Sequence, residues 1–162
     1  MKFEHYMKRV EASKEFRKFK KENKEAYLCA GFFVLDFENE KNMHQLDYYL
    51  ESGKVATILT DNGIKINISK QAIKKKLLEI KQPVMTDLDA IRGIVHDEMQ
   101  NRSITEEIKK IIAIVYIVDN KIVWNLQCIL NGLILLHVNV DDSNQSILMF
   151  EKFSLLDLIR KV

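Results

Sequence analysis

Residues 27–37 read YLCAGFFVLDF and residues 110–118 read KIIAIVYIV. A strand with one solvated face alternates apolar and polar residues, because successive side chains point to opposite faces. Neither stretch alternates, and both are rich in the aromatic and branched residues that favour strands. We therefore expect two central strands that are shielded on both faces. Helices can cover one face, so the second cover has to come from the other half of the chain, a partner subunit or a ligand.

Shorter runs bounded by turn residues predict the remaining strands, three in each half of the chain. They cover residues 44–50, 55–59, 64–68, 122–130, 133–140 and 146–150. The tripeptide Asp61-Asn62-Gly63 is a strong hairpin signal, because Asn-Gly tolerates the positive φ of a primed turn.

Apolar residues at helical spacing predict four helices, over residues 3–24, 70–81, 87–101 and 155–161. Ser69 is the expected N-cap of the second helix, and Pro83 ends it. Thr86 begins a sequence that resembles a capping box, and Ser154 is the expected cap of the last helix.

Both halves of the chain thus contain a helix, four strands and a helix, and the fold class is α+β. We predict two similar helix–four-strand antiparallel meander–helix halves, residues 1–82 and 83–162, with sheets packed on helices; one continuous domain is the alternative. The turns LESG at 50–53 and ILNG at 129–132 occupy the same place, 79 positions apart. Two unrelated antiparallel meanders that use the same turn residues would show the same sequence pattern.

Composition narrows the class of protein. The chain has 162 residues, of which 47% are hydrophobic and 30% charged, and this excludes a disordered chain. One proline and five glycines exclude collagen-like and linker sequences. The longest apolar run has eight residues, whereas a membrane helix needs roughly 20. The start MKFEH is charged and unlike a signal peptide, and two cysteines make no disulfide scaffold, so we expect a cytoplasmic protein without membrane contact.

Basic charge gathers in two segments although the formal net charge is only +2. Residues 1–25 carry a net charge of +4 and residues 65–81 a net charge of +5. The possible phosphate contacts are Lys18, Lys21, Lys74, Lys75 and Lys76, to which Lys14 and Lys20 can be added. Solvated helix surfaces explain the same pattern without nucleic acid.

Three aromatic residues are candidates for a ligand or partner surface: Tyr48, Tyr49 and Trp124. Trp124 alternates with apolar residues, which favours a place in the core. Tyr49 shares its side of the strand with Gln45 and Asp47, so it is the ring most expected at the surface.

No motif points to catalysis, and we predict no catalytic residue, no cofactor and no metal ligand. The four histidines, His5, His44, His96 and His137, fall in four different elements without metal-ligand spacing. Cys29 and Cys128 stand in apolar runs, where a thiol usually packs as a small hydrophobe rather than acting as a nucleophile.

Several stretches resemble known proteins. AYLCAGFF at 26–33, VHDEMQNR at 95–102, WNLQC at 124–128 and FSLLD at 153–157 resemble small proteins of nanosized, host-dependent (DPANN-type) archaea, a resemblance that implies no activity. The helix at 87–101 and VNVDD at 138–142 resemble PepSY-like and cystatin-like modules, in which a helix packs on an antiparallel meander. Those modules bind proteins or inhibit proteases, and PepSY examples usually lie outside the cytoplasm. The doubled order also resembles the saddle of the TATA-binding protein, but the strand at 64–68 and the small net charge depart from it.

These observations favour a non-catalytic protein-binding or assembly module, as a homodimer or with another protein partner. Two alternatives stay open. One is a nucleic-acid binder that uses the Lys-rich segments, and the other is a small-ligand-binding protein or enzyme with a pocket between the halves.

Overall fold

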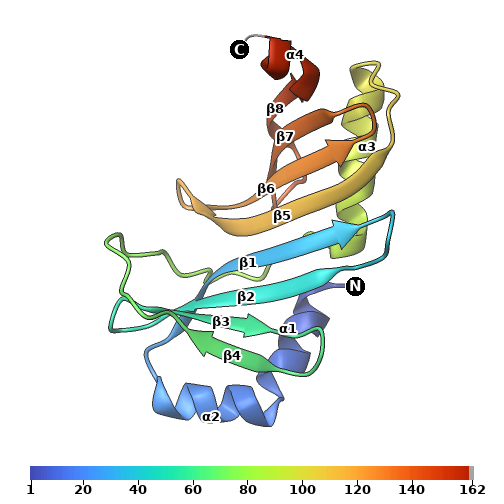
Figure 1. Ribbon diagram of the computed structural model, residues 1–162. Helices are drawn as coiled ribbons and strands as arrows, with labels where there is room; N and C mark the ends of the chain where they lie inside the picture. Colours follow the sequence, from blue (N-terminus) through green and yellow to red (C-terminus); the bar gives the residue numbers. More distant parts are fainter. Residues whose placement is uncertain (161–162) are drawn as a thin grey trace.

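The computed structural model describes residues 1–160, apart from the side chain of Leu158. Its centre is one antiparallel sheet of eight strands in the order β4-β3-β2-β1-β5-β6-β7-β8 (Figure 1). The strands are β1 Tyr27–Asp36, β2 Met43–Tyr49, β3 Val55–Leu59, β4 Lys65–Ile68, β5 Ile108–Val118, β6 Lys121–Leu130, β7 Ile134–Asp141 and β8 Ile147–Ser154. The predicted α+β class and all eight predicted strands are confirmed.

The two halves of the chain meet where β1 pairs with β5. This antiparallel register runs from Ala30 opposite Tyr116 to Asp36 opposite Lys110. On either side of this pair, each half adds its three further strands as a meander. The halves therefore share one continuous sheet. Two similar halves would give this strand order, and their duplication stays a prediction.

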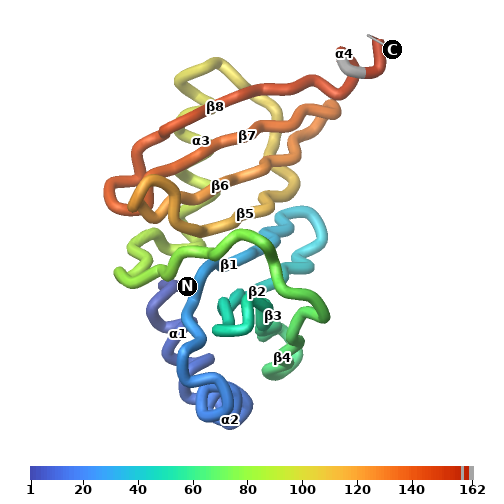
Figure 2. The backbone as a smooth tube through the Cα atoms, turned by 90° about the vertical axis from the view of Figure 1, so that its left-hand side faces the viewer, coloured from blue at the N-terminus to red at the C-terminus, as the bar shows by residue number. Residues whose placement is uncertain are grey.

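Three helices cover one face of the sheet (Figures 1 and 2). Helices α1 Phe3–Glu11 and α2 Lys14–Glu22 lie on the first half, and α3 Ile91–Asn101, preceded by the short 3-10 helix η1 Leu88–Ala90, lies on the second. The last helix, α4 Leu155–Arg160, follows β8 directly. Lys161, the last residue of the helix predicted there, lies outside the described residues.

The prediction of one helix over residues 3–24 is wrong, because the chain breaks at Ser13. The Ser13 hydroxyl accepts a hydrogen bond from the Phe16 backbone N–H at 3.2 Å and donates to the Val10 carbonyl at 2.6 Å. Ser13 therefore caps α2, and the second helix can turn its two phenylalanines toward the sheet.

The predicted helix at 70–81 is also absent, and Ser69 caps no helix there. Residues 69–85, here called the strap, run without regular structure along one end of the sheet (Figure 2). The sheet supplies the bonds that a helix would make internally: Ile73 N–H donates to the Gly53 carbonyl at 2.9 Å, and Ile80 N–H donates to the Leu28 carbonyl at 2.8 Å. Tertiary hydrogen bonds thus override a local helical pattern.

Phe33 on β1 is the centre of the core beneath the helices and is fully buried. Its ring lies 5.9 Å from each of the rings of Phe3, Tyr6 and Trp124. Gly31, one pleat away, makes room for it, because an added Cβ would lie 2.8 Å from the Phe33 ring and 2.9 Å from Val115. The helical face is therefore tightly packed where the two halves meet.

A buried carboxylate fastens the strap to the second half of the sheet. Asp142, 2% exposed, accepts hydrogen bonds from the Trp124 indole N–H at 2.9 Å, the Met85 N–H at 2.7 Å and the Thr86 N–H at 2.9 Å. Thr86 is thus held by Asp142 rather than starting a helix, and the Asp87 side chain caps η1 instead. The capping box expected at Thr86 is wrong for this reason.

Replacing Asp142 by Ala should lower the free energy of unfolding by about 3 kcal/mol, because three N–H groups, two of them in buried hydrogen bonds, lose their acceptor. Urea denaturation measures this loss. The matched control is Asp97→Ala at an exposed position of α3, which should change stability by less than about 0.5 kcal/mol. Equal losses of stability in the two variants would contradict the role of Asp142 in fastening the strap to the sheet.

Candidate functional site

The face of the sheet opposite the helices, here called the open face, carries an apolar ridge on the two central strands. Phe32 and Val34 of β1 stand opposite Ile114 and Ile112 of β5. All four side chains are half-buried, whereas Phe33, Ala113 and Val115 on the helical side are fully buried. Within this chain the helices cover one face, and the other half of the chain does not cover the second one completely. The cover expected from a partner subunit or a ligand stays a prediction. The strap lies along the end of the sheet and leaves the ridge partly open to water.

Polar side chains on β2 and β3 flank the ridge on one side. Asp47 lies opposite Ala30, and its Oδ1 accepts hydrogen bonds from Gln45 Nε2 at 3.0 Å and from Thr57 Oγ1 at 3.1 Å. Burial raises the pKa of the Asp47 carboxyl, and these two hydrogen bonds oppose the shift. This flank thus holds one acid in a partly desolvated site.

Amides and a histidine on β6 and β7 flank the ridge on the other side. Asn125 Nδ2 lies 2.9 Å from His137 Nε2, and Gln127 stands opposite His137 across the strands. The buried Oδ1 of Asn139 has no hydrogen-bond partner among the described residues. This flank can donate and accept hydrogen bonds beside an apolar strip.

Where the strap meets the open face, an open cavity of about 320 Å³ is lined mainly by apolar side chains. Leu77 and Leu78 of the strap face Ala30, Ile114 and Tyr116 of the sheet across it. A second cavity of about 390 Å³ adjoins it. Leu78 and Ile117 line both, so the strap has a hollow along its inner side.

Of the three candidate aromatic rings, only Tyr49 lies on the open side. Trp124 is fully buried, and Tyr48, 4% exposed, packs 5.4 Å from the Phe16 ring beneath α2. Tyr49 is half-buried and stacks on Tyr27, with ring centres 5.5 Å apart. The Tyr27 hydroxyl donates to the Leu77 carbonyl at 2.5 Å, so this stack supports the strap.

The candidate phosphate contacts do not gather in one place. Lys18 and Lys21 are exposed on α2, on the helical side of the sheet, whereas Lys74, Lys75 and Lys76 are exposed on the strap (Figures 1 and 2). Lys18 borders a groove that it shares with Glu15 and Glu22. The sheet separates the two groups of lysines, as is typical of solvated surfaces.

The two thiols are poorly suited to nucleophilic chemistry. Burial raises the pKa of both Cys29 and Cys128 to about 12, and Cys29 donates its S–H to the Asp47 carbonyl at 3.3 Å. In the part of the chain that the structure describes, neither thiol is hydrogen-bonded to a histidine.

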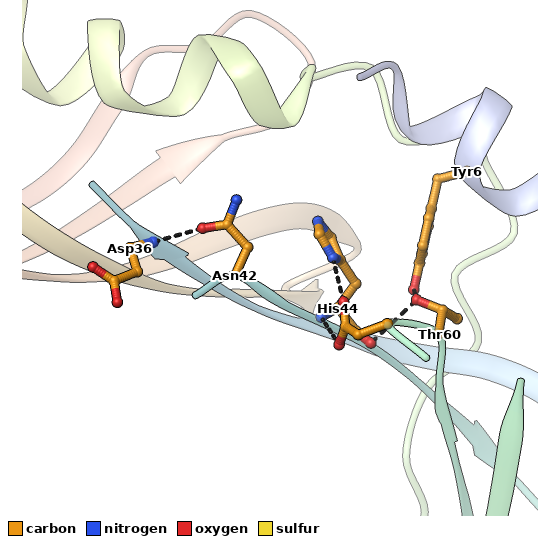
Figure 3. A network of polar contacts seen from close by, with 6 residues as sticks. Tyr6, Asp36, Asn42, His44 and Thr60 are labelled. Atoms are coloured by element: carbon orange, nitrogen blue, oxygen red, sulfur yellow. Dashed lines mark hydrogen bonds and ion pairs between the residues drawn. The ribbon is translucent and has the colours of Figure 1, made fainter. Parts of the chain in front are cut away.

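A polar network joins β2 to the chain after β3 (Figure 3). His44 Nδ1 lies 2.9 Å from Asp61 Oδ1, and the Tyr6 hydroxyl lies 2.8 Å from Thr60 Oγ1. The His44 backbone N–H also donates to Asp61, at 3.0 Å. Because the Asp61 carboxylate contacts both the ring and the backbone N–H of His44, the network anchors the β3–β4 loop to β2.

Within residues 1–160, no group of three His, Cys, Asp or Glu side chains is placed to hold a metal ion. None of the helices within that range is long and apolar enough to cross a membrane.

Comparison with known proteins bears on the fold alone. No family model matches the chain, and no curated protein matches it. A crystal structure titled as a putative lipoprotein from Clostridium difficile 630 is similar, with a TM-score of 0.56 and 11% sequence identity. The similarity covers 86% of this chain and 90% of that one. The resemblance to proteins of host-dependent archaea and to PepSY-like modules stays a prediction.

Sequence reasoning missed the flank on β6 and β7. Its signal was an alternation of polar and apolar residues, with Asn125 and Gln127 on one strand and His137 and Asn139 on the next. Alternation shows that these side chains share a face. Only the pairing of β6 with β7 shows that they are neighbours.

Asp47→Asn should stabilise the protein more at neutral pH than near pH 3. Because burial raises the pKa of Asp47 in the folded state above its value in the unfolded chain, the carboxyl favours folding when protonated. That contribution is lost as the pH rises through the folded-state pKa, and Asn does not ionise. Urea unfolding of both proteins at the two pH values measures the difference, and a pH-independent difference would contradict it.

Both cysteines should react slowly with a thiol-specific disulfide reagent in the native protein at mildly alkaline pH, because burial and a pKa of about 12 leave little accessible thiolate. In denaturant, both should react fully and fast. Absorbance of the released reagent measures the rates. A native rate equal to the denatured rate would contradict the burial of these thiols.

Proposed function

We propose that this chain is a non-catalytic protein-binding module and that the open face is its binding surface. The observation that most directly supports this proposal is the half-buried ridge in the middle of the sheet, formed by Phe32, Val34, Ile112 and Ile114. An apolar face of a sheet normally packs against another element. A partner that covered the ridge would remove this apolar surface from water, which favours association.

The surroundings of the ridge support this assignment. Protein interfaces combine an apolar centre with a polar rim that supplies hydrogen bonds. Here the rim has Asp47 with Gln45 on one side and Asn125 with His137 on the other. From β2 to β6 there are three strand spacings, roughly 14 Å, wide enough for one helix of the partner, whose diameter is about 10–12 Å.

A small apolar ligand is the second candidate for occupant, and the 320 Å³ cavity beside the strap favours it. A nucleic-acid role has less support, since the candidate lysines lie on separate elements on either side of the sheet. The two buried free thiols favour a reducing compartment, so we place the protein in the cytoplasm.

Photocrosslinking in cells that naturally express the chain tests the proposal. A benzoylphenylalanine at position 112, on the ridge, should give one discrete protein adduct on a gel. The matched control carries the same group in place of Asp97, exposed on the opposite side of the molecule on α3, and should give none.

Adding Ile114→Lys to the crosslinking chain should abolish the adduct while far-UV circular dichroism shows an intact fold, because a charge in the ridge opposes burial. An adduct that survives this change, or that forms equally from position 97, would contradict the proposal. A small molecule retained in native mass spectrometry, without any adduct, would favour the second candidate.

A further inference from the structure

The strand β8 forms one edge of the sheet, and exposed apolar side chains concentrate around it. Of the eleven large hydrophobic residues exposed among those described, seven lie between residues 129 and 159. They are Ile129, Leu133, Leu148, Phe153, Leu155, Leu156 and Ile159. A long edge strand with apolar side chains is a template for pairing with another chain.

The helix α4 gives a second reason to expect that another chain covers this edge of the sheet. It projects beyond the corner of the sheet in both views (Figures 1 and 2). It has six residues, and a helix of that length needs tertiary packing to be stable. Leu156 is 45% exposed and Ile159 is 67% exposed, so these two apolar side chains are only partly packed within the chain.

We propose that a second copy of this chain pairs with β8, strand against strand and antiparallel, to form a twofold dimer. A twofold axis perpendicular to a sheet sets an edge strand opposite itself in the antiparallel direction. The dimer therefore needs no other surface. The proposal is independent of the open face and of its partner.

The charges of β8 select the register. The twofold axis leaves each face of the sheet on its own side, so directly opposed residues of the two copies have side chains on the same face. One residue of β8 is therefore at the axis, where it stands directly opposite the same residue of the second copy. With Glu151 or Lys152 on the axis, like charges would stand directly opposite each other, which is destabilising. With Phe150 on the axis, Met149 faces Glu151 and Leu148 faces Lys152 of the second copy. This register has the longest overlap that avoids like charges.

In this register α4 also acquires a neighbour. Ser154 ends β8 and comes to lie beside residue 146 of the second copy, so α4 begins at the start of that copy's β8. Leu148, 49% exposed, is the nearest exposed apolar residue there. The pairing brings the exposed apolar residues of β8 and α4 to the contact between the two copies; they are Leu148, Phe153, Leu155, Leu156 and Ile159.

Light scattering coupled to size exclusion tests the dimer, and the two edges of the sheet offer a matched pair of variants. Leu148 on β8 and Ile68 on β4 are both edge-strand residues that are 49% exposed. The protein should elute as a dimer, Leu148→Lys as a folded monomer, and Ile68→Lys as a dimer. A monomeric wild type overturns the proposal, as does a dimer that Ile114→Lys dissociates and Leu148→Lys leaves intact.

A disulfide tests the register. Phe150→Cys, on the axis, should oxidise to a covalent dimer, since directly opposed residues have Cα atoms about 4.5–5.5 Å apart. Asn67→Cys, exposed on the β4 edge, should not, and the native Cys29 and Cys128 are buried. If loss of Phe150 impairs folding, Met149→Cys combined with Glu151→Cys should give the same crosslink. Absence of the crosslink from a folded variant overturns the proposed register.

Discussion

The pairing of β1 with β5 is the constraint on which the rest of the structure depends. It joins the two halves of the chain through backbone hydrogen bonds between Ala30–Asp36 and Lys110–Tyr116. Because it lies at the centre, its side chains face the helices on one side and the open face on the other. Phe33 and Val115 fill the first side, and Gly31 allows them to approach. A change here would disturb both halves at once.

The two sides of this pair are unequal, and the difference suggests where function lies. The helical side is closed by aromatic rings from α1 and from β6, with Trp124 fastened by the Asp142 carboxylate. The open side has only the strap, along one end. A rigid, fully packed layer behind a half-exposed one provides a surface whose shape is fixed before any partner arrives, which lowers the entropic cost of binding.

The strands could be predicted because their signals are local: branched and aromatic runs between turn residues such as Asn62-Gly63. The strap could not, because its bonds go to Gly53 and Leu28, far away in the sequence. The alternation of Trp124 with apolar residues likewise predicted that it is buried. Tyr48 is buried because it packs beneath α2, whereas its neighbour Tyr49 points to the other face of the sheet. The open face itself needed the register of eight strands, which no local pattern contains.

The opposite edges of the sheet differ in a way that limits the size of any assembly. At one edge, β4 has four residues, and a groove beside it is shared with α2 and its charged side chains. At the other, β8 has eight residues and leads into an apolar helix. Strand addition is therefore favoured at one end only. Two chains that pair through β8 leave no free β8 edge for a third chain. Growth therefore stops at a closed assembly, and an open-ended fibre does not form.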